Sequence, residues 1–148
     1  RYGAVRDAQA CQGAHEVLNH HDPDHVKKAL SLTGGKGYDV IVEMLANVNL
    51  NNDLTLIGRC GRVMIVGSRG RIEIEPRQLM TKGSSIIGTS LLGASDSELL
   101  AVHTTIFSAL STGAIRPIVR TTMPLSQAAE AHKLVMEPGA MGNIVLLP

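Results

Sequence analysis

The sequence predicts an α/β protein whose strands form a mostly parallel sheet. Short apolar runs, rich in β-branched residues, alternate with segments of helical spacing along the chain. The apolar residues 63–66 lie between glycines, as in a strand that is buried on both faces. The turn that follows, from Gly67 to Gly70, lies at the carboxyl end of that strand, where open α/β sheets bind their ligands.

The individual elements follow from the same patterns. We expect strands at residues 16–19, 38–44, 61–66, 85–91, 115–119 and 143–147. The strand at 115–119 contains Pro117, which favours a position at a sheet edge. Helices are expected to end at Gly13 and to begin at Pro23, near Val48, at Pro76, at Asp96 and after Ser126. The longest helix should cover 96–110, because Ser95 and Glu98 have capping-box spacing.

Composition excludes several classes of protein. The chain has 148 residues, 44% hydrophobic and 18% charged, which is a globular composition of about one domain. One Phe, two Tyr, no Trp and a net charge of +1 argue against a nucleic-acid module, which needs aromatic platforms and a basic field. Cys11 and Cys60 are too few for a disulfide framework or a zinc site, so we expect reduced thiols and a cytoplasmic protein. The N-terminus lacks a signal-peptide pattern, and no apolar run approaches the roughly 18 residues that span a bilayer.

The glycine turn after residue 66 is the first candidate site. Gly67 would let the backbone approach a ligand, while Ser68 supplies a hydroxyl and Arg69 a cation. The alternative is a tight turn without a ligand. Asn49 follows the strand at 38–44 and could bond a ligand, although from sequence a helix cap is favoured. His20 ends the first expected strand, at the same edge of the sheet as Ser68, and could therefore contact the same ligand. The alternative interpretation is a solvated histidine in a loop.

Two further patterns carry less weight. A cluster of histidines suggests a metal site, but the spacing is wrong for a helical ligand pair and no Cys or carboxylate partner is fixed; its members are His15, His20, His21 and His25. We therefore expect no metal. Residues 33–37, Thr-Gly-Gly-Lys-Gly, resemble a phosphate loop but lack its spacing, which favours a helix end and a turn.

Residues 13–20, the Glu-Met-Leu-Ala-Asn-Val-Asn-Leu sequence of 43–50 and residues 61–70 together resemble one family. It is the zinc-free medium-chain dehydrogenase/reductase family, in its zeta-crystallin-type quinone oxidoreductases. The resemblance runs from about Gly13 to the C-terminus. It implies hydride transfer from NADPH to a quinone, a Rossmann cofactor domain, a separate catalytic domain and no zinc. It also implies a homo-oligomer, dimer or tetramer, without a membrane. RNA binding is implied by the family only, and neither charge nor aromatic content supports it here.

The resemblance also implies which residues contact NADPH, and it assigns no catalytic side chain. His20 would lie near the 2′-phosphate and Asn49 near the crevice, with one wall formed by Val66, Gly67, Ser68 and Arg69, and with Thr89, Ser90 and Leu91 beside the nicotinamide half.

Parts of the family pattern do not occur in this sequence. The glycine-rich turn that grips the pyrophosphate is not found, nor is the catalytic domain. We therefore expect residues 1–112 to form an incomplete Rossmann domain that lacks its first βα units. Residues 113–148 should be a C-terminal segment that returns to the catalytic domain.

In the Rossmann order 3-2-1-4-5-6, the strands at 16–19, 38–44, 61–66 and 85–91 would be numbers three to six. Strand three would then lack a neighbour, and strand four would expose an apolar edge. We expect an unstable chain with weak or no reductase activity alone. The alternatives are a non-enzymatic NADPH-binding, crystallin-like or RNA-interacting protein, and half of a zinc alcohol dehydrogenase, which would need a Cys cluster that is not found here.

Overall fold

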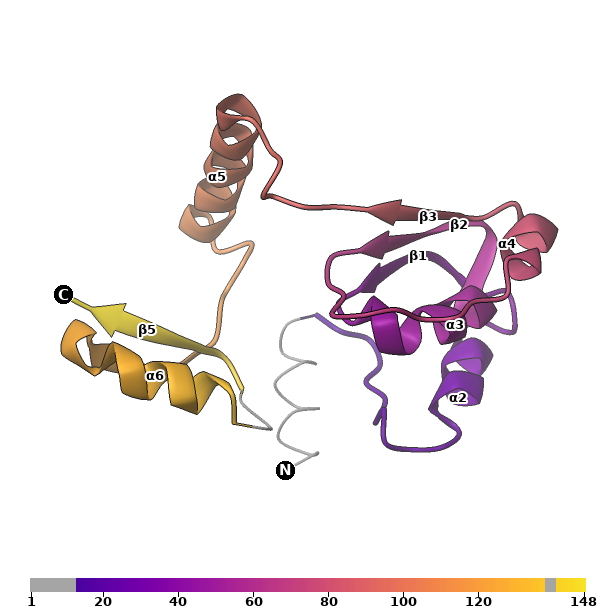
Figure 1. Ribbon diagram of the computed structural model, residues 1–148, viewed down its shortest axis with the longest axis horizontal. Coiled ribbons are helices and arrows are strands. Elements are labelled where there is room, and N and C mark those ends of the chain that lie inside the picture. Colours follow the sequence, from indigo (N-terminus) through magenta and orange to yellow (C-terminus); the bar gives the residue numbers. More distant parts are fainter. Residues whose placement is uncertain (1–12, 138–140) are drawn as a thin grey trace. The chain divides into compact units, whose positions relative to one another are not determined.

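The computed structural model describes residues 13–137 and 141–148, so the helix predicted before Gly13 lies outside the described residues. The chain forms two compact units. The sheet unit is Leu18–Ser95, and the C-terminal unit is Asp96–Pro148 together with the described residues before Leu18 (Figure 1). The domain boundary predicted after residue 112 stays a prediction.

The sheet unit contains a three-stranded parallel sheet. Its strands are β1 (Tyr38–Glu43), β2 (Ile57–Ile65) and β3 (Ser85–Gly88), in the spatial order β1-β2-β3. Met64 at the centre pairs with Val42 on one side and with Ile87 on the other. The parallel α/β class is confirmed, and these strands have the neighbour order predicted for strands four, five and six.

Three helices accompany this sheet. They are α2 (His25–Leu32), α3 (Ala46–Leu56) and α4 (Arg77–Lys82). Helix α3 packs against β1 and β2, α4 against β2, and α2 against α3 (Figure 1). Because α3 connects β1 to the parallel strand β2, it is the crossover helix of a βαβ unit.

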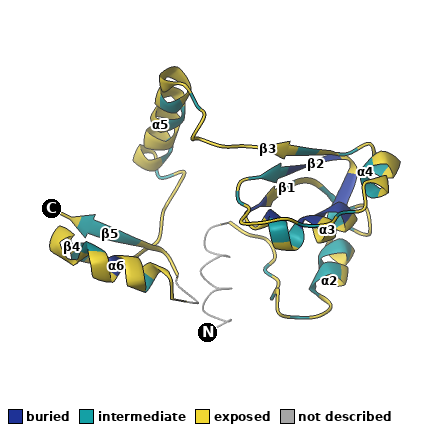
Figure 2. Cartoon of the chain, viewed as in Figure 1, coloured by how far each residue is buried: buried dark blue, intermediate teal, exposed yellow. Residues whose placement is uncertain are grey.

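The core lies between α3 and β2. Leu54, Ile57 and Val63 are fully buried, and Ala46 and Leu50 on α3 are nearly so. Figure 2 shows that most of the buried residues of the sheet unit lie on these two elements. Val63 belongs to the apolar run that predicted a strand buried on both faces, and it is fully buried, but Met64 and Ile65 are half-buried and Val66 is 46% exposed.

A lysine closes the C-terminal end of α3. The Lys82 Nζ atom donates hydrogen bonds to the carbonyl oxygens of Leu54 (2.7 Å), Thr55 (2.9 Å) and Ile57 (2.8 Å). Leu54 and Thr55 lie in the last turn of α3 and Ile57 directly follows it, so the ammonium group satisfies carbonyls that no helix amide reaches and also opposes the negative end of the helix dipole. Burial lowers the pKa of Lys82. The helix that carries Lys82 ends at Gly83 with φ of 59°, as predicted.

Several boundaries in the sheet unit differ from the prediction, and among them β2 begins at Ile57 rather than at residue 61. Residues 16–19 form no strand, and within the described residues the three-stranded sheet begins with β1. Helix α2 begins at His25 rather than Pro23, since Asp22 first makes a turn in which its Oδ1 accepts the Asp24 amide (2.9 Å). Strand β3 ends at Gly88, and the chain turns before Ala94, whose amide donates to the Leu91 carbonyl (3.2 Å).

The C-terminal unit contains α5 (Asp96–Ser111), β4 (Val119–Pro124), a 3-10 turn (Leu125–Gln127), α6 (Ala128–Val135) and β5 (Asn143–Leu147). Strands β4 and β5 pair in parallel. The predicted strand at 115–119 is wrong: the strand begins where that segment ends, beyond Pro117, which has no amide to donate. Ser126 lies inside the 3-10 turn and does not cap α6. None of the described helices is long and apolar enough to cross a lipid bilayer.

Candidate functional site

The carboxyl ends of β1 and β2 are joined by backbone hydrogen bonds into one rim. The Glu43 carbonyl oxygen accepts the amides of Val66 (2.9 Å) and Gly67 (3.3 Å). In return, the Gly67 carbonyl accepts the amide of Ala46 (2.9 Å), the first residue of α3. The loop after β2 is therefore fixed against the N-terminal end of the crossover helix.

A side-chain contact extends this rim. Asn47 Oδ1 accepts the backbone amide of Arg69 at 2.8 Å, and the Ser68 hydroxyl donates to the Gly70 carbonyl at 3.3 Å. The side chains of Ser68 and Arg69 are exposed. Within the described residues Arg69 forms no salt bridge. The guanidinium group is therefore available to an anion at the end of the sheet.

Asn49 does not cap the helix, which corrects the interpretation that the sequence favoured. Helix α3 begins at Ala46 after Leu45, and the Asn49 amide already donates to the Leu45 carbonyl (3.2 Å) inside the helix. Its side-chain Nδ2 points to Glu43 and donates to Oε1 at 3.3 Å. Asn49 is thus held by the last residue of β1.

Two carboxyl groups lie buried beneath the rim, and the sequence patterns did not single them out. Glu43 is 6% exposed and Asp53 is 5% exposed. Glu43 Oε1 also accepts the Leu45 amide. Burial raises the pKa of Asp53 to about 7, with further contributions from the negative charge of Glu43 and a hydrogen bond with it. A signal was present in the sequence: Glu43 is a charged residue that follows the apolar run Val40-Ile41-Val42.

The segment after β3 reaches the same end of the sheet. The Thr89 amide donates to the carbonyl of Ile65 (3.0 Å), the residue before Val66. Ser90 lies in the turn that follows, where its hydroxyl oxygen accepts the Leu92 amide (3.2 Å), and Leu91 is 61% exposed. Thr89 therefore joins the rim, and Ser90 and Leu91 lie just beyond it along the chain.

The prediction that His20 lies on the same rim as Ser68 has lost its basis. That prediction depended on a strand at 16–19, which the structure lacks. His20 is exposed, and its ring lies 3.9 Å from the His21 ring, measured between centroids. No hydrogen bond described for residues 13–137 joins His20 to Ser68 or Arg69. Its contact with the cofactor stays a prediction.

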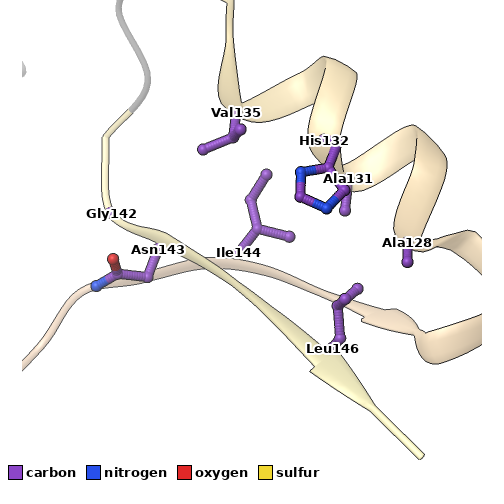
Figure 3. A pocket seen from close by; sticks show the side chains of 8 residues that line it. All are labelled: Ala128, Ala131, His132, Val135, Gly142, Asn143, Ile144 and Leu146. Atoms are coloured by element: carbon purple, nitrogen blue, oxygen red, sulfur yellow. The ribbon is translucent and has the colours of Figure 1, made fainter. Parts of the chain in front are cut away.

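The C-terminal unit has a hollow of its own between α6 and β5, with a volume of about 250 Å³. Its lining is mostly apolar and includes Ala131, Val135 and Ile144, with His132 and Asn143 as polar members. Figure 3 shows Ile144 pointing from β5 toward α6. None of the predicted site residues lines this hollow.

A family model described as zinc-binding dehydrogenase matches residues 12–146. The chain belongs to this family. It is also 47% identical over 136 residues to a quinone oxidoreductase of Sus scrofa. The match covers 91% of this chain and 41% of that relative, so the chain spans less than half of the relative's length. The predicted resemblance to quinone oxidoreductases is confirmed.

Solved structures agree with the fold. A crystal structure of an NAD-dependent alcohol dehydrogenase has a TM-score of 0.83 and 29% identity, with 100% of this chain and 42% of that chain covered. An Escherichia coli quinone oxidoreductase complexed with NADPH has a TM-score of 0.81 and 24% identity, with 98% and 47% covered, which supports the fold alone. The family description mentions zinc, but within residues 13–137 and 141–148 no group of three His, Cys, Asp or Glu side chains could hold a metal ion.

Proposed function

We propose that this chain is the cofactor-binding and C-terminal portion of an NADPH-dependent quinone oxidoreductase. The main support for this proposal is the rim at the carboxyl ends of β1 and β2. It presents Gly67, the exposed hydroxyl of Ser68 and the guanidinium of Arg69 where open α/β sheets bind ligands. The quinone oxidoreductase of Sus scrofa, at 47% identity, supplies the reaction class.

The rim residues have separate roles in this proposal. Gly67 lets the dinucleotide approach the backbone, and Ser68 and Asn49 offer hydrogen bonds. Arg69 offers a positive charge to a phosphate, and Thr89, Ser90 and Leu91 lie along the nicotinamide half. NADPH would supply the hydride that reduces the quinone.

Catalysis by such a site is mainly positioning. The protein would hold the nicotinamide ring against the quinone and exclude water from the space between them. We also propose an assembly of identical copies and a preference for NADPH over NADH, with Arg69 and His20 as the groups that bind the 2′-phosphate.

The proposal is tested by titrating the chain with NADPH and following the nicotinamide fluorescence, while circular dichroism monitors folding. We expect saturable binding that Arg69→Ala weakens. The matched control is Arg59→Ala, since Arg59 is exposed near the start of β2, at the opposite end of the same strand. A folded chain that does not bind NADPH, or equal weakening by both substitutions, would contradict the proposed site.

Turnover is a separate measurement. Quinone-dependent NADPH oxidation by the chain should be far below that of an intact quinone oxidoreductase, because the chain spans 41% of such a relative. Turnover comparable to the intact enzyme would show that this chain contains a complete active site, which the proposal does not predict.

A further inference from the structure

The buried carboxyl pair beneath the rim makes contacts that the proposed cofactor site does not yet explain. Glu43 ends β1, and its side-chain Oε1 accepts both the Leu45 amide and the Asn49 Nδ2 group. Asp53 follows Asn49 by one helical turn on α3, so the two side chains lie on the same face of the helix. The side chains of Asn49 and Asp53 therefore both lie within hydrogen-bonding reach of Glu43.

Ionisation of both buried carboxyl groups is unfavourable, because neither could then donate to the other and their charges would repel. Asp53 Oδ2 is buried and finds no hydrogen-bond partner among the described residues. A proton on Asp53 converts that acid into a donor toward Glu43. Glu43 then keeps the charge and remains an acceptor for Leu45 and Asn49.

No neighbouring cation neutralises the pair. On α4, the Lys82 ammonium group is engaged with three carbonyls at the far end of α3. On α2, Lys27 and Lys28 pair with Asp24 and Asp22. The arginines of β2, at 59 and 62, are exposed. Within the described residues no salt bridge involves Glu43 or Asp53, so a shared proton is the remaining way to limit the buried charge.

The charged acceptor also fixes the orientation of the Asn49 amide. A carboxylate can only accept hydrogen bonds, so the NH₂ group of Asn49 must face Glu43 and its carbonyl oxygen must face away. We propose that Glu43 and Asp53 share one proton and act as a positioning pair, which holds Asn49 so that its carbonyl oxygen is presented to a hydrogen-bond donor of the bound dinucleotide. The donor would be a ribose hydroxyl or an amide, and this part of the inference rests on the proposed function.

Loss of the shared proton would disturb this arrangement. With both carboxyls ionised, the two charges repel, and the Glu43 oxygen that holds Leu45 and Asn49 moves. The affinity for NADPH should then fall about 2- to 10-fold, the effect of one hydrogen bond. The raised pKa of Asp53, about 7, places this change near neutral pH.

The test is a pH titration of the chain by NMR, with labelled side-chain carboxyl and Asn amide groups and without any cofactor. We expect one carboxyl to titrate near pH 7, and the Asn49 side-chain amide signals to shift with the same midpoint. Asp53→Asn keeps a donor toward Glu43 and should abolish both titrations. Asp24→Asn, at an exposed acid in the same unit, should leave them unchanged. The proposal is overturned if no carboxyl of the folded chain titrates near neutral pH, or if the chemical shifts of the Asn49 side-chain amide do not change with that titration.

The cofactor enters only in a second measurement. The affinity of the chain for NADPH should fall between about pH 6 and about pH 8, and Asp53→Asn should remove that dependence. A pH dependence that persists in the variant would refute the link to binding. A chain that does not bind NADPH but shows the NMR titrations would refute the proposed function alone. If Asp53→Asn does not fold, the titrations of the unsubstituted chain still decide between the outcomes.

Discussion

Gly67 lies against the carbonyl oxygen of Met44 so closely that no side chain fits between them. A Cβ atom at Gly67 would come well within 3.0 Å of that oxygen, a separation that real Cβ atoms essentially never show. The contact lies where the loop after β2 passes the end of β1, and the Ala46 amide bonds the Gly67 carbonyl beside it. The glycine is thus required by the approach of two backbones, before any ligand is considered.

We predict that Gly67→Ala destabilises the chain by about 1–3 kcal/mol, because the methyl group forces the two loops apart. Urea unfolding measures the change in free energy. Gly88→Ala is the control, since a Cβ at Gly88 meets no atom within 4 Å. Equal losses of unfolding free energy in the two variants would show that the close contact with Met44 does not make the substitution at Gly67 destabilising.

Lys82 should contribute to the stability of α3 through its C-terminal carbonyls. Lys82→Met keeps the length of the side chain but leaves the carbonyls of Leu54, Thr55 and Ile57 without their donor. We expect a loss of about 1–3 kcal/mol in the free energy of unfolding. Lys36→Met, at an exposed residue outside the helices, should have little effect. A neutral Lys82→Met variant would argue against the cap.

The Asp53 carboxyl should make stability depend on pH. Its pKa is raised from 3.8 to about 7 in the folded chain, so between these values the folded state holds a proton that the unfolded state has released. Stability therefore falls as the pH rises through this window, by roughly 2 kcal/mol between pH 5 and pH 8. Thermal unfolding across that range should show the slope in the unsubstituted chain and a flatter profile for Asp53→Asn. An unchanged slope in the variant would assign the dependence to another group.

His20 provides a test of cofactor preference. A histidine near the adenosine 2′-phosphate would bind NADPH more tightly than NADH, so His20→Ala should weaken NADPH binding more than NADH binding. Fluorescence titration with each cofactor gives the two dissociation constants. His21→Ala is the matched control, because its ring is the neighbour of His20. Equal weakening of both cofactors by His20→Ala would remove His20 from the site.

Strand β1 forms one edge of the sheet in the described chain, and it carries exposed apolar side chains. Val40 is 48% exposed and Val42 62%, and Met44, directly after the strand, is 64% exposed. An exposed, apolar edge strand can pair with the edge strand of another copy of the chain, which promotes aggregation. Val42→Lys should therefore reduce light scattering of concentrated chain more than Val135→Lys does, since Val135 is similarly exposed, at 55%, but lies on a helix. Equal improvement by both would indicate a general charge effect.

Local patterns were sufficient for much of the fold. The apolar runs located β1, β2 and β5, and helical spacing with its boundary residues located α4 and α5. The strand at 16–19 failed because a strand is a pairing between distant segments, and its own residues do not reveal whether a neighbour exists. The segment at 115–119 failed for a related reason: β4 forms only where the chain pairs with β5, after Pro117.

The sequence by itself determined the parallel α/β class, the position of the glycine turn after β2 and the resemblance to quinone oxidoreductases. The first two features are local patterns, which hydrophobicity and turn residues record directly, and the resemblance rests on the residues at 13–20, 43–50 and 61–70. The tertiary structure decided that Asn49 faces Glu43, that Asp53 is buried beside that carboxylate and that Lys82 caps a helix 28 positions earlier in the chain. Burial and hydrogen-bond partners are properties of segments brought together by folding, so residue type and spacing alone do not specify them.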